Sequence, residues 1–169
     1  MRRVVGIDIG MKNTAVVITD ERADKDGRLE RRVNEFHMVS FGSLLDVPLC
    51  FIEMMDTIST ADRIGVERQV PKNKKAQLLA QHIKSCISMW MFLNGRRCPP
   101  IDDLDARIKS VPFSAPKKVD LKKWCVEKAR ELLAEEADLD GLKILESLKK
   151  KDDFCDAYLY TRAMLMEVN

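Results

Sequence analysis

Two short apolar runs open the chain and predict a β-hairpin. Residues Arg3 to Gly10 and Thr14 to Thr19 are rich in β-branched side chains, and only Met11-Lys12-Asn13 separates them. A second polar turn, Asp24 to Gly27, precedes an imperfect alternation of apolar and polar residues from Arg32 to Ser40. We therefore expect three antiparallel strands at the start of the chain.

Helical and extended patterns then alternate. Val47 to Ile58 carries apolar residues at helical spacing, and Ile64 to Glu67 is a short apolar strand. Because a helix precedes this strand, we expect it to lie parallel to the first strand. A long helix over Asn73 to Leu93 follows, and a fifth strand is predicted over Arg107 to Phe113.

The remaining segments complete a mixed α/β sheet covered by helices. Glycine, arginine and proline residues predict a loop from Gly95 to Asp105. We expect a helix over Val119 to Ala134, a short helix or turn over Leu142 to Leu148, and a final helix over Asp152 to Glu167. A chain of 169 residues suits one well-buried core, so residues 1–169 are expected to form a single domain.

The predicted long helix is apolar on two sides. One stripe consists of Leu79, Ile83, Cys86, Trp90 and Leu93, and a second stripe beside it consists of Leu78, His82, Met89 and Phe92. A helix that is apolar over more than half of its circumference must be covered on more than one side. The sheet can cover one side, and either a second copy of the protein or another internal helix can cover the other.

Carboxylates stand at the ends of three apolar segments. Asp8 interrupts the first strand, Glu67 closes the fourth, and Asp153 and Asp156 lie one turn apart at the start of the last helix. A buried carboxylate is costly unless it is neutralised, and a hard cation is the natural partner. These four residues could hold two Mg²⁺ ions about 4 Å apart for phosphodiester hydrolysis. Asp152 points elsewhere and suits the helix N-terminus.

Composition narrows the class of protein. A content of 46% hydrophobic and 33% charged residues is ordinary for a folded domain. Five scattered cysteines without a Cys-x-x-Cys pair suggest neither disulfides nor zinc, which favours a reducing, intracellular compartment. No segment has the pattern of a signal peptide or the length of a membrane span, so no membrane association is expected.

Local charge favours a nucleic-acid partner although the net charge is only +2. Four basic residues follow the fourth strand without an intervening acid: Arg68, Lys72, Lys74 and Lys75. The segment from Ala106 to Arg130 holds eight basic residues against two acids, Asp120 and Glu127. For any one such run, a solvated helix face is an equally good explanation.

The acidic motifs resemble those of ribonuclease-H-like nucleases, and within them those of RuvC-type Holliday junction resolvases. Gly6-Ile7-Asp8-Ile9-Gly10, Val66-Glu67-Arg68-Gln69 and Asp153-x-x-Asp156 leading into Ala157-Tyr158-Leu159 occur in the family's order and at similar separations. Ile7-Asp8-Ile9-Gly10-x-Lys12-Asn13 and Glu67-Arg68-Gln69 are most similar to resolvases of poxviruses and other large DNA viruses, with fungal mitochondrial resolvases as a related branch. Each motif alone is weak, since Gly-Ile-Asp-x-Gly also opens actin-like ATPases, but the ordered set is more specific.

The resemblance implies a ribonuclease-H-like, mixed five-stranded sheet and a homodimer that nicks a four-way DNA junction symmetrically with Mg²⁺ or Mn²⁺. It implies metal ligation and catalysis by Asp8, Glu67, Asp153 and Asp156. It also implies a contribution of the long helix to the dimer interface. The residues expected to contact DNA are Lys12, Arg68, Lys72, Lys74, Lys75, Lys117, Lys118, Lys122 and Lys123, among which no catalytic lysine is singled out. If the source is viral, host cytoplasm or sites of viral DNA replication are the expected location.

Three other functions compete with junction resolution. A general DNA or RNA nuclease of the same superfamily would share the acids. An actin-like ATPase would need more glycine-rich phosphate loops than seven glycines provide, and an inert DNA-binding module would have little use for four carboxylates. Packing is the expected role of His37, His82, Trp90 and Trp124.

Overall fold

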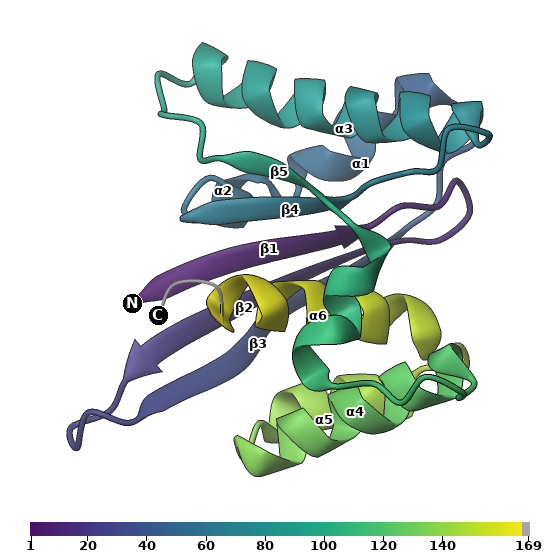
Figure 1. The fold of residues 1–169 in the computed structure, drawn as a ribbon. Coiled ribbons are helices and arrows are strands. Elements are labelled where there is room, and N and C mark those ends of the chain that lie inside the picture. Colours follow the sequence, from purple (N-terminus) through teal and green to yellow (C-terminus); the bar gives the residue numbers. More distant parts are fainter. Residues whose placement is uncertain (167–169) are drawn as a thin grey trace.

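A five-stranded mixed sheet forms the centre of the protein in this computed structural model, which describes residues 1–166 (Figure 1). The strand order is β3-β2-β1-β4-β5. Strands β1, β2 and β3 pair antiparallel, whereas β4 and β5 run parallel to β1. The strands span Arg2–Asp8 (β1), Thr14–Ala23 (β2), Leu29–Val39 (β3), Arg63–Glu67 (β4) and Ile101–Leu104 (β5). The predicted fold class is confirmed.

Helices cover both faces of the sheet (Figure 1). One layer contains the 3₁₀ turn η1 (Leu44–Asp46) and helices α1 (Val47–Ile52), α2 (Met55–Ile58) and α3 (Lys74–Leu93). The opposite layer contains α4 (Leu121–Glu135), α5 (Leu139–Ser147) and α6 (Asp152–Met166). Two short 3₁₀ helices, η2 (Ala106–Lys109) and η3 (Val111–Phe113), connect β5 to this second layer. Glu167, the predicted end of the last helix, lies outside the described residues.

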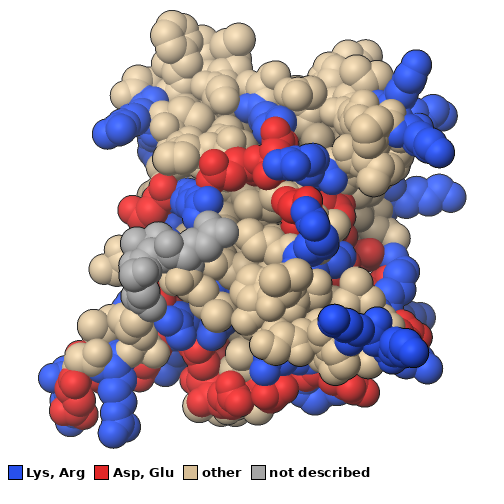
Figure 2. Space-filling view, viewed as in Figure 1, with Lys and Arg blue, Asp and Glu red and all other residues tan. Residues whose placement is uncertain are grey.

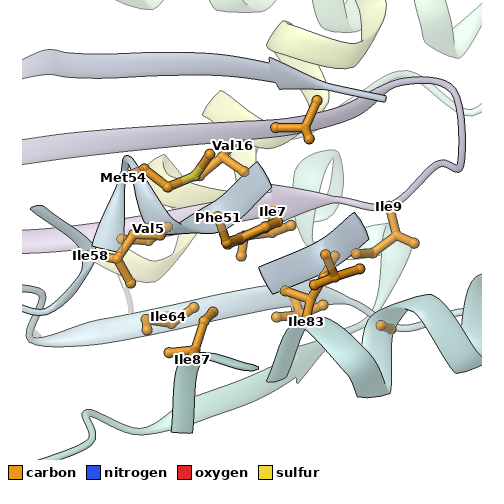
Figure 3. Packing of buried hydrophobic residues seen from close by; sticks show 14 of the residues in the cluster. Val5, Ile7, Ile9, Val16, Phe51, Met54, Ile58, Ile64, Ile83 and Ile87 are labelled. Atoms are coloured by element: carbon orange, nitrogen blue, oxygen red, sulfur yellow. The ribbon is translucent and has the colours of Figure 1, made fainter. Parts of the chain in front are cut away.

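Strand alternation divides the core between the two layers. Val5 and Ile7 of β1 pack with Phe51, Ile83 and other apolar side chains of α1, α2 and α3 (Figure 3). The intervening Val4 belongs to a cluster with α6 residues. Because successive side chains of a strand point to opposite faces, Asp8 falls on the same side of the sheet as Val4, facing α6.

The fifth strand lies in a different segment from the one predicted. Arg107 to Phe113 was expected to be extended, but it forms η2 and η3, and Pro112 cannot donate a ladder hydrogen bond. The strand is instead Ile101–Leu104, inside the predicted loop from Gly95 to Asp105. Its two adjacent acids read as loop residues, but each has a partner from a neighbouring element, since Arg63 binds Asp102 and Lys84 binds Asp103. These tertiary ion pairs are not visible in a local pattern.

The helix predicted over Val47 to Ile58 is two helices separated by a turn. Phe51, Met54, Met55 and Ile58 are all buried in the same cluster. Their i, i+3, i+4, i+7 spacing is that of one helix face, so α1 and α2 together bury one continuous apolar face in spite of the turn between them.

Candidate active site at the ends of β1, β4 and α6

Register and alternation bring Asp8 and Glu67 together. The parallel pairing of β1 with β4 places Ile7 opposite Val66, so the next residues, Asp8 and Glu67, close adjacent strands side by side. Both carboxylates face α6, since Ile7 and Val66 pack in the opposite layer. The two sequence-predicted strand-end acids therefore share one edge of the sheet.

Two glycines allow α6 to approach the sheet closely. A Cβ at Gly6 of β1 would collide with the backbone carbonyl oxygen of Ala157, and one at Gly65 of β4 would lie 2.8 Å from the Met164 sulfur. Such separations are possible only without a side chain. The part of α6 that carries Asp156 is thereby held against the sheet near the ends of β1 and β4.

Electrostatics places Asp8, Glu67 and Asp156 in one cluster. Burial is the largest cause of a raised pKa at Asp8, and together with the negative charges of Glu67 and Asp156 it raises the pKa of this carboxyl group to about 8. Burial also raises the pKa of Asp156, against the opposing effect of Lys109. Carboxylates shifted in this way by desolvation and like charge are typical of functional sites.

Lys109 is a site residue that the sequence did not single out. Its ammonium forms an ion pair with Asp156, and both side chains are largely buried. Burial acts to lower the pKa of Lys109, but Asp156, Asp8 and Glu67 outweigh it and raise the pKa above its ordinary value. The only signal was membership of the basic Ala106 to Arg130 stretch, because the segment was predicted as a strand rather than a 3₁₀ helix.

Asp153 lies beside the cluster and is held by a different lysine. Lys150 Nζ donates to both of its carboxylate oxygens, at 2.8 and 2.7 Å. The charge of Asp8 also acts on Lys150, which places this pair at the margin of the cluster. Asp152 is bound by Lys122 at 3.0 Å. The structure thus brings Asp8, Glu67 and Asp156 together and leaves Asp153 and Asp152 beside them, where Lys150 forms ion pairs with both.

The carboxylate oxygens of the cluster are suitable ligands for a hard cation, although the side chains do not point to one common position. Within residues 1–166, no three Asp, Glu, His or Cys side chains form a ready metal-binding group. Asp8, Glu67 and Asp156 nevertheless provide oxygen ligands from adjacent element ends, and their repulsion raises the pKa of Asp8. A divalent cation would relieve that repulsion, as the Lys109 ammonium now does in part.

The predicted DNA contacts are all exposed, and four of them line two separate cavities. The nine residues are Lys12, Arg68, Lys72, Lys74, Lys75, Lys117, Lys118, Lys122 and Lys123. Arg68 and Lys74 line a cavity of about 540 Å³ between α3 and the ends of β4 and β5. Lys122 and Lys123 line a second cavity, of about 410 Å³, with Lys149, Lys150 and Lys151. On the face seen in Figure 2, acidic side chains form a band across the middle with Lys and Arg beside them.

The other singled-out residues lie away from the acids. His37 on β3 contacts Glu35 at 3.0 Å, and His82 is exposed on α3 rather than packed in the core. Trp90 is half-buried against the apolar cluster that includes α3, and Trp124 is half-buried against the cluster that includes α4 and α6. No helix in the described part of the chain is long and apolar enough to cross a membrane.

Solved structures share this fold along nearly the whole chain, whereas no family model and no curated protein matches the sequence. The fowlpox virus Holliday junction resolvase is 14% identical, with a TM-score of 0.64 and 99% of each chain covered. The yeast mitochondrial Holliday junction resolvase Ydc2 is 19% identical, with a TM-score of 0.61 over 94% of this chain and 75% of that one. RuvC of Thermus thermophilus bound to a Holliday junction substrate is 11% identical, with a TM-score of 0.62, and the match covers 99% of this chain and 96% of that chain. The chain has the fold of RuvC-type resolvases.

Proposed function

We propose that this chain, which folds as RuvC-type resolvases do, is a DNA endonuclease that resolves four-way junctions by phosphodiester hydrolysis. The observation that carries the proposal is the buried cluster of Asp8, Glu67 and Asp156 with Lys109, located between two cavities lined by basic side chains. A site of this kind can bind a phosphate flanked by further phosphates. Likeness of fold to three junction resolvases supports branched DNA as the proposed substrate class.

Asp8, Glu67 and Asp156 are the proposed ligands of Mg²⁺ or Mn²⁺, and Asp153 joins them if it leaves Lys150. A bound divalent cation would supply a nucleophilic water and charge neutralisation at the scissile phosphate. Lys109 contributes a permanent positive charge, because neighbouring carboxylates raise its pKa. That charge offsets the acids and attracts the phosphate. Burial of these side chains strengthens each of these interactions by lowering the local dielectric constant.

The basic residues around the cluster would hold the DNA backbone. Arg68 and Lys74 lie on the β4 and α3 side, whereas Lys122 and Lys123 lie on the α4 side. Contacts of this kind are sequence-independent, and they weaken steeply as salt concentration rises. Two basic surfaces on either side of one cleavage site suit a substrate whose arms leave in different directions.

A homodimer is proposed through the outer face of α3. The stripe of Leu78, Met89 and Phe92 is exposed, at 52%, 58% and 78% respectively. Exposed apolar rows of this length are typical of protein interfaces. The same layer also exposes Leu45, Leu49 and Ile52. A two-fold dimer would present two equivalent active sites to a junction that has matching symmetry.

A cruciform plasmid distinguishes junction resolution from general nuclease activity. With Mg²⁺ or Mn²⁺, the protein should introduce paired, symmetric nicks near the branch point and linearise the plasmid within one binding event. Ca²⁺ should support binding only. Accumulation of singly nicked circles, or equal cutting of linear duplex, would favour the alternative, a general DNA or RNA nuclease of the same superfamily.

The Asp8→Asn variant tests the assignment of the acids. It should abolish cleavage yet bind a junction in EDTA as tightly as the wild type or more tightly, because a charge that repels phosphate is removed. Asp56→Asn is a matched control, since Asp56 is an exposed acid on α2 away from the cluster. Cleavage by Asp8→Asn at the rate of the control would contradict the assignment.

A further inference from the structure

Tyr160 is a buried tyrosine located directly beneath the acid cluster. It follows Asp156 by one turn of α6, so the two side chains lie on the same face of the helix. Its side chain is fully buried in a cluster with Val4 of β1, Leu104 of β5 and Ile108 of η2. Tyr160 therefore fills the space between the sheet and the 3₁₀ helix that carries Lys109.

The ring of Tyr160 supports the Lys109 ammonium. Lys109 Nζ lies 5.7 Å from the ring centroid, within the range of a cation–π interaction. The same ammonium forms the ion pair with Asp156. The tyrosine ring and the aspartate thus hold Lys109 from two sides, and both belong to α6.

The hydroxyl group of Tyr160 is buried and has no hydrogen-bond partner within residues 1–166. Burial raises the pKa of this hydroxyl, and the charge of Glu67, followed by those of Asp8 and Asp156, raises it further. Glu67 is paired with Leu104 in the register of β4 and β5, and Leu104 packs in the same cluster as Tyr160, so Glu67 ends its strand beside the tyrosine. A buried donor without an acceptor lowers stability, and a hydroxyl left unpaired in this way is available to bond a neighbouring carboxylate.

We propose that Tyr160 is a positioning residue of the active site, whose hydroxyl donates to the Glu67 carboxylate when a divalent cation is bound and whose ring fixes Lys109. The inference rests on the proposed metal-dependent function and names a further residue for it. Oriented by this bond, one Glu67 oxygen is occupied and the other remains free for the cation. Residues that orient metal ligands in this way contribute strongly to affinity.

Replacement of Tyr160 by phenylalanine separates this role from a purely structural one. Tyr160→Phe keeps the ring and its contact with Lys109 but removes the hydroxyl. In EDTA, the variant should melt at the same temperature as the wild type or higher, because an unpartnered buried donor is lost. Its affinity for Ca²⁺, measured by calorimetry without DNA, should fall about tenfold or more.

Tyr158→Phe is the matched control. Tyr158 is the other tyrosine of the chain, is 2% exposed on the same helix, and packs in a different cluster, with Phe154 stacked beside it. We expect its Ca²⁺ affinity to stay within about twofold of the wild type, because it touches no proposed ligand. With tyrosine labelled at the ring carbon that bears the hydroxyl, NMR should show one signal shifting on Ca²⁺ addition in the wild type and in Tyr158→Phe.

The outcomes distinguish this inference from the function on which it rests. Wild-type Ca²⁺ affinity in Tyr160→Phe, or a labelled Tyr160 signal that ignores Ca²⁺, would overturn the role of Tyr160 alone. A loss of affinity that accompanies a lower melting temperature in EDTA would indicate a structural role and also overturn it. No Ca²⁺ binding by the wild-type protein would overturn the proposed metal site, and this inference with it.

Discussion

Gly6 and Ala157 are in direct backbone contact across the interface between β1 and α6. The missing Cβ of Gly6 leaves room for the carbonyl oxygen of Ala157, with the Thr161 methyl 2.9 Å from the position that a Cβ would take. Asp8 follows Gly6 by two residues and Asp156 precedes Ala157. This close backbone approach between strand and helix therefore lies near two of the clustered carboxylates.

Gly6→Ala should displace α6 and impair both stability and cleavage. The obstructing atom is backbone, which cannot rotate away, so we expect a loss of about 2 to 3 kcal/mol in the free energy of unfolding. Urea denaturation measures this loss, and a junction-cleavage assay should show a reduced rate. Gly42→Ala is the control, because a Cβ there meets only an Asp46 carboxylate oxygen at 3.2 Å. Equal stability of the two variants would contradict the packing argument.

Lys109→Gln should destabilise the metal-free protein more than the metal-bound protein. Removal of the ammonium leaves Asp156 buried without its partner, at a cost of about 2 kcal/mol or more. A divalent cation supplies positive charge at the same carboxylates, so Ca²⁺ should restore much of the loss. Melting temperatures in EDTA and in Ca²⁺ measure this difference. Lys143→Gln breaks only an exposed pair with Asp140 and should have little effect in either buffer.

Asp153 and Asp152 should differ in importance although they are adjacent. If Asp153 leaves Lys150 to join the metal site, Asp153→Asn should reduce the cleavage rate by about 100-fold or more, the scale of a lost metal interaction. Asp152→Asn should be much milder, since Asp152 binds Lys122 at the surface. Single-turnover cleavage of a junction compares them. A similar loss of cleavage rate in both variants would mean that the two acids act only through their negative charge at the N-terminus of α6.

The outer face of α3 should hold two copies together. Light scattering at micromolar concentration should give about twice the chain mass of 19.4 kDa. Met89→Asp and Phe92→Asp place charges on the exposed stripe and should yield monomers. Leu139→Asp is the control, because Leu139 is 65% exposed on α5 in the opposite layer. A monomeric wild type would exclude this interface.

Glu35 should make stability depend on pH at a point remote from the active site. Burial acts to raise its pKa, but hydrogen bonds from Thr57 and His37 outweigh it, so the pKa lies below its ordinary value of 4.5. A depressed folded-state pKa contributes stability above the unfolded-state pKa, and this contribution is lost as pH falls through the folded value. Glu35→Gln should therefore lose about 1 kcal/mol at pH 7 and almost nothing at a pH low enough to protonate Glu35 in the folded protein.

Urea denaturation at the two pH values checks this expectation. Glu30→Gln is the control, since Glu30 is an exposed residue of the same strand with one weak partner, Arg32, at 3.4 Å. Its substitution should change stability by less than about 0.5 kcal/mol. A Glu35→Gln effect of equal size at both pH values would show that packing, not charge, is responsible.

Local patterns of apolar and polar residues were sufficient to predict the features that depend on the periodicity of strands and helices. The alternation in β1 and β4 specified strands and also the face on which Asp8 and Glu67 lie, because side-chain direction in a strand has a period of two. Helical spacing found α3, including an outer apolar stripe that the structure leaves exposed. Three ordered acidic motifs were sufficient to indicate the fold.

Only the tertiary structure could decide the features that depend on residues distant in the sequence. β5 contains adjacent acids that are neutralised by Arg63 and Lys84 from other elements, so its own sequence reads as a loop. In the sequence, Lys109 is only one of eight basic residues between Ala106 and Arg130, whereas in the structure η2 places it against Asp156. Tyr160 was not singled out by the sequence, and its position below the cluster depends on how α6 crosses the sheet. Sequence determines what each segment prefers, whereas pairing between segments determines which charges and donors meet.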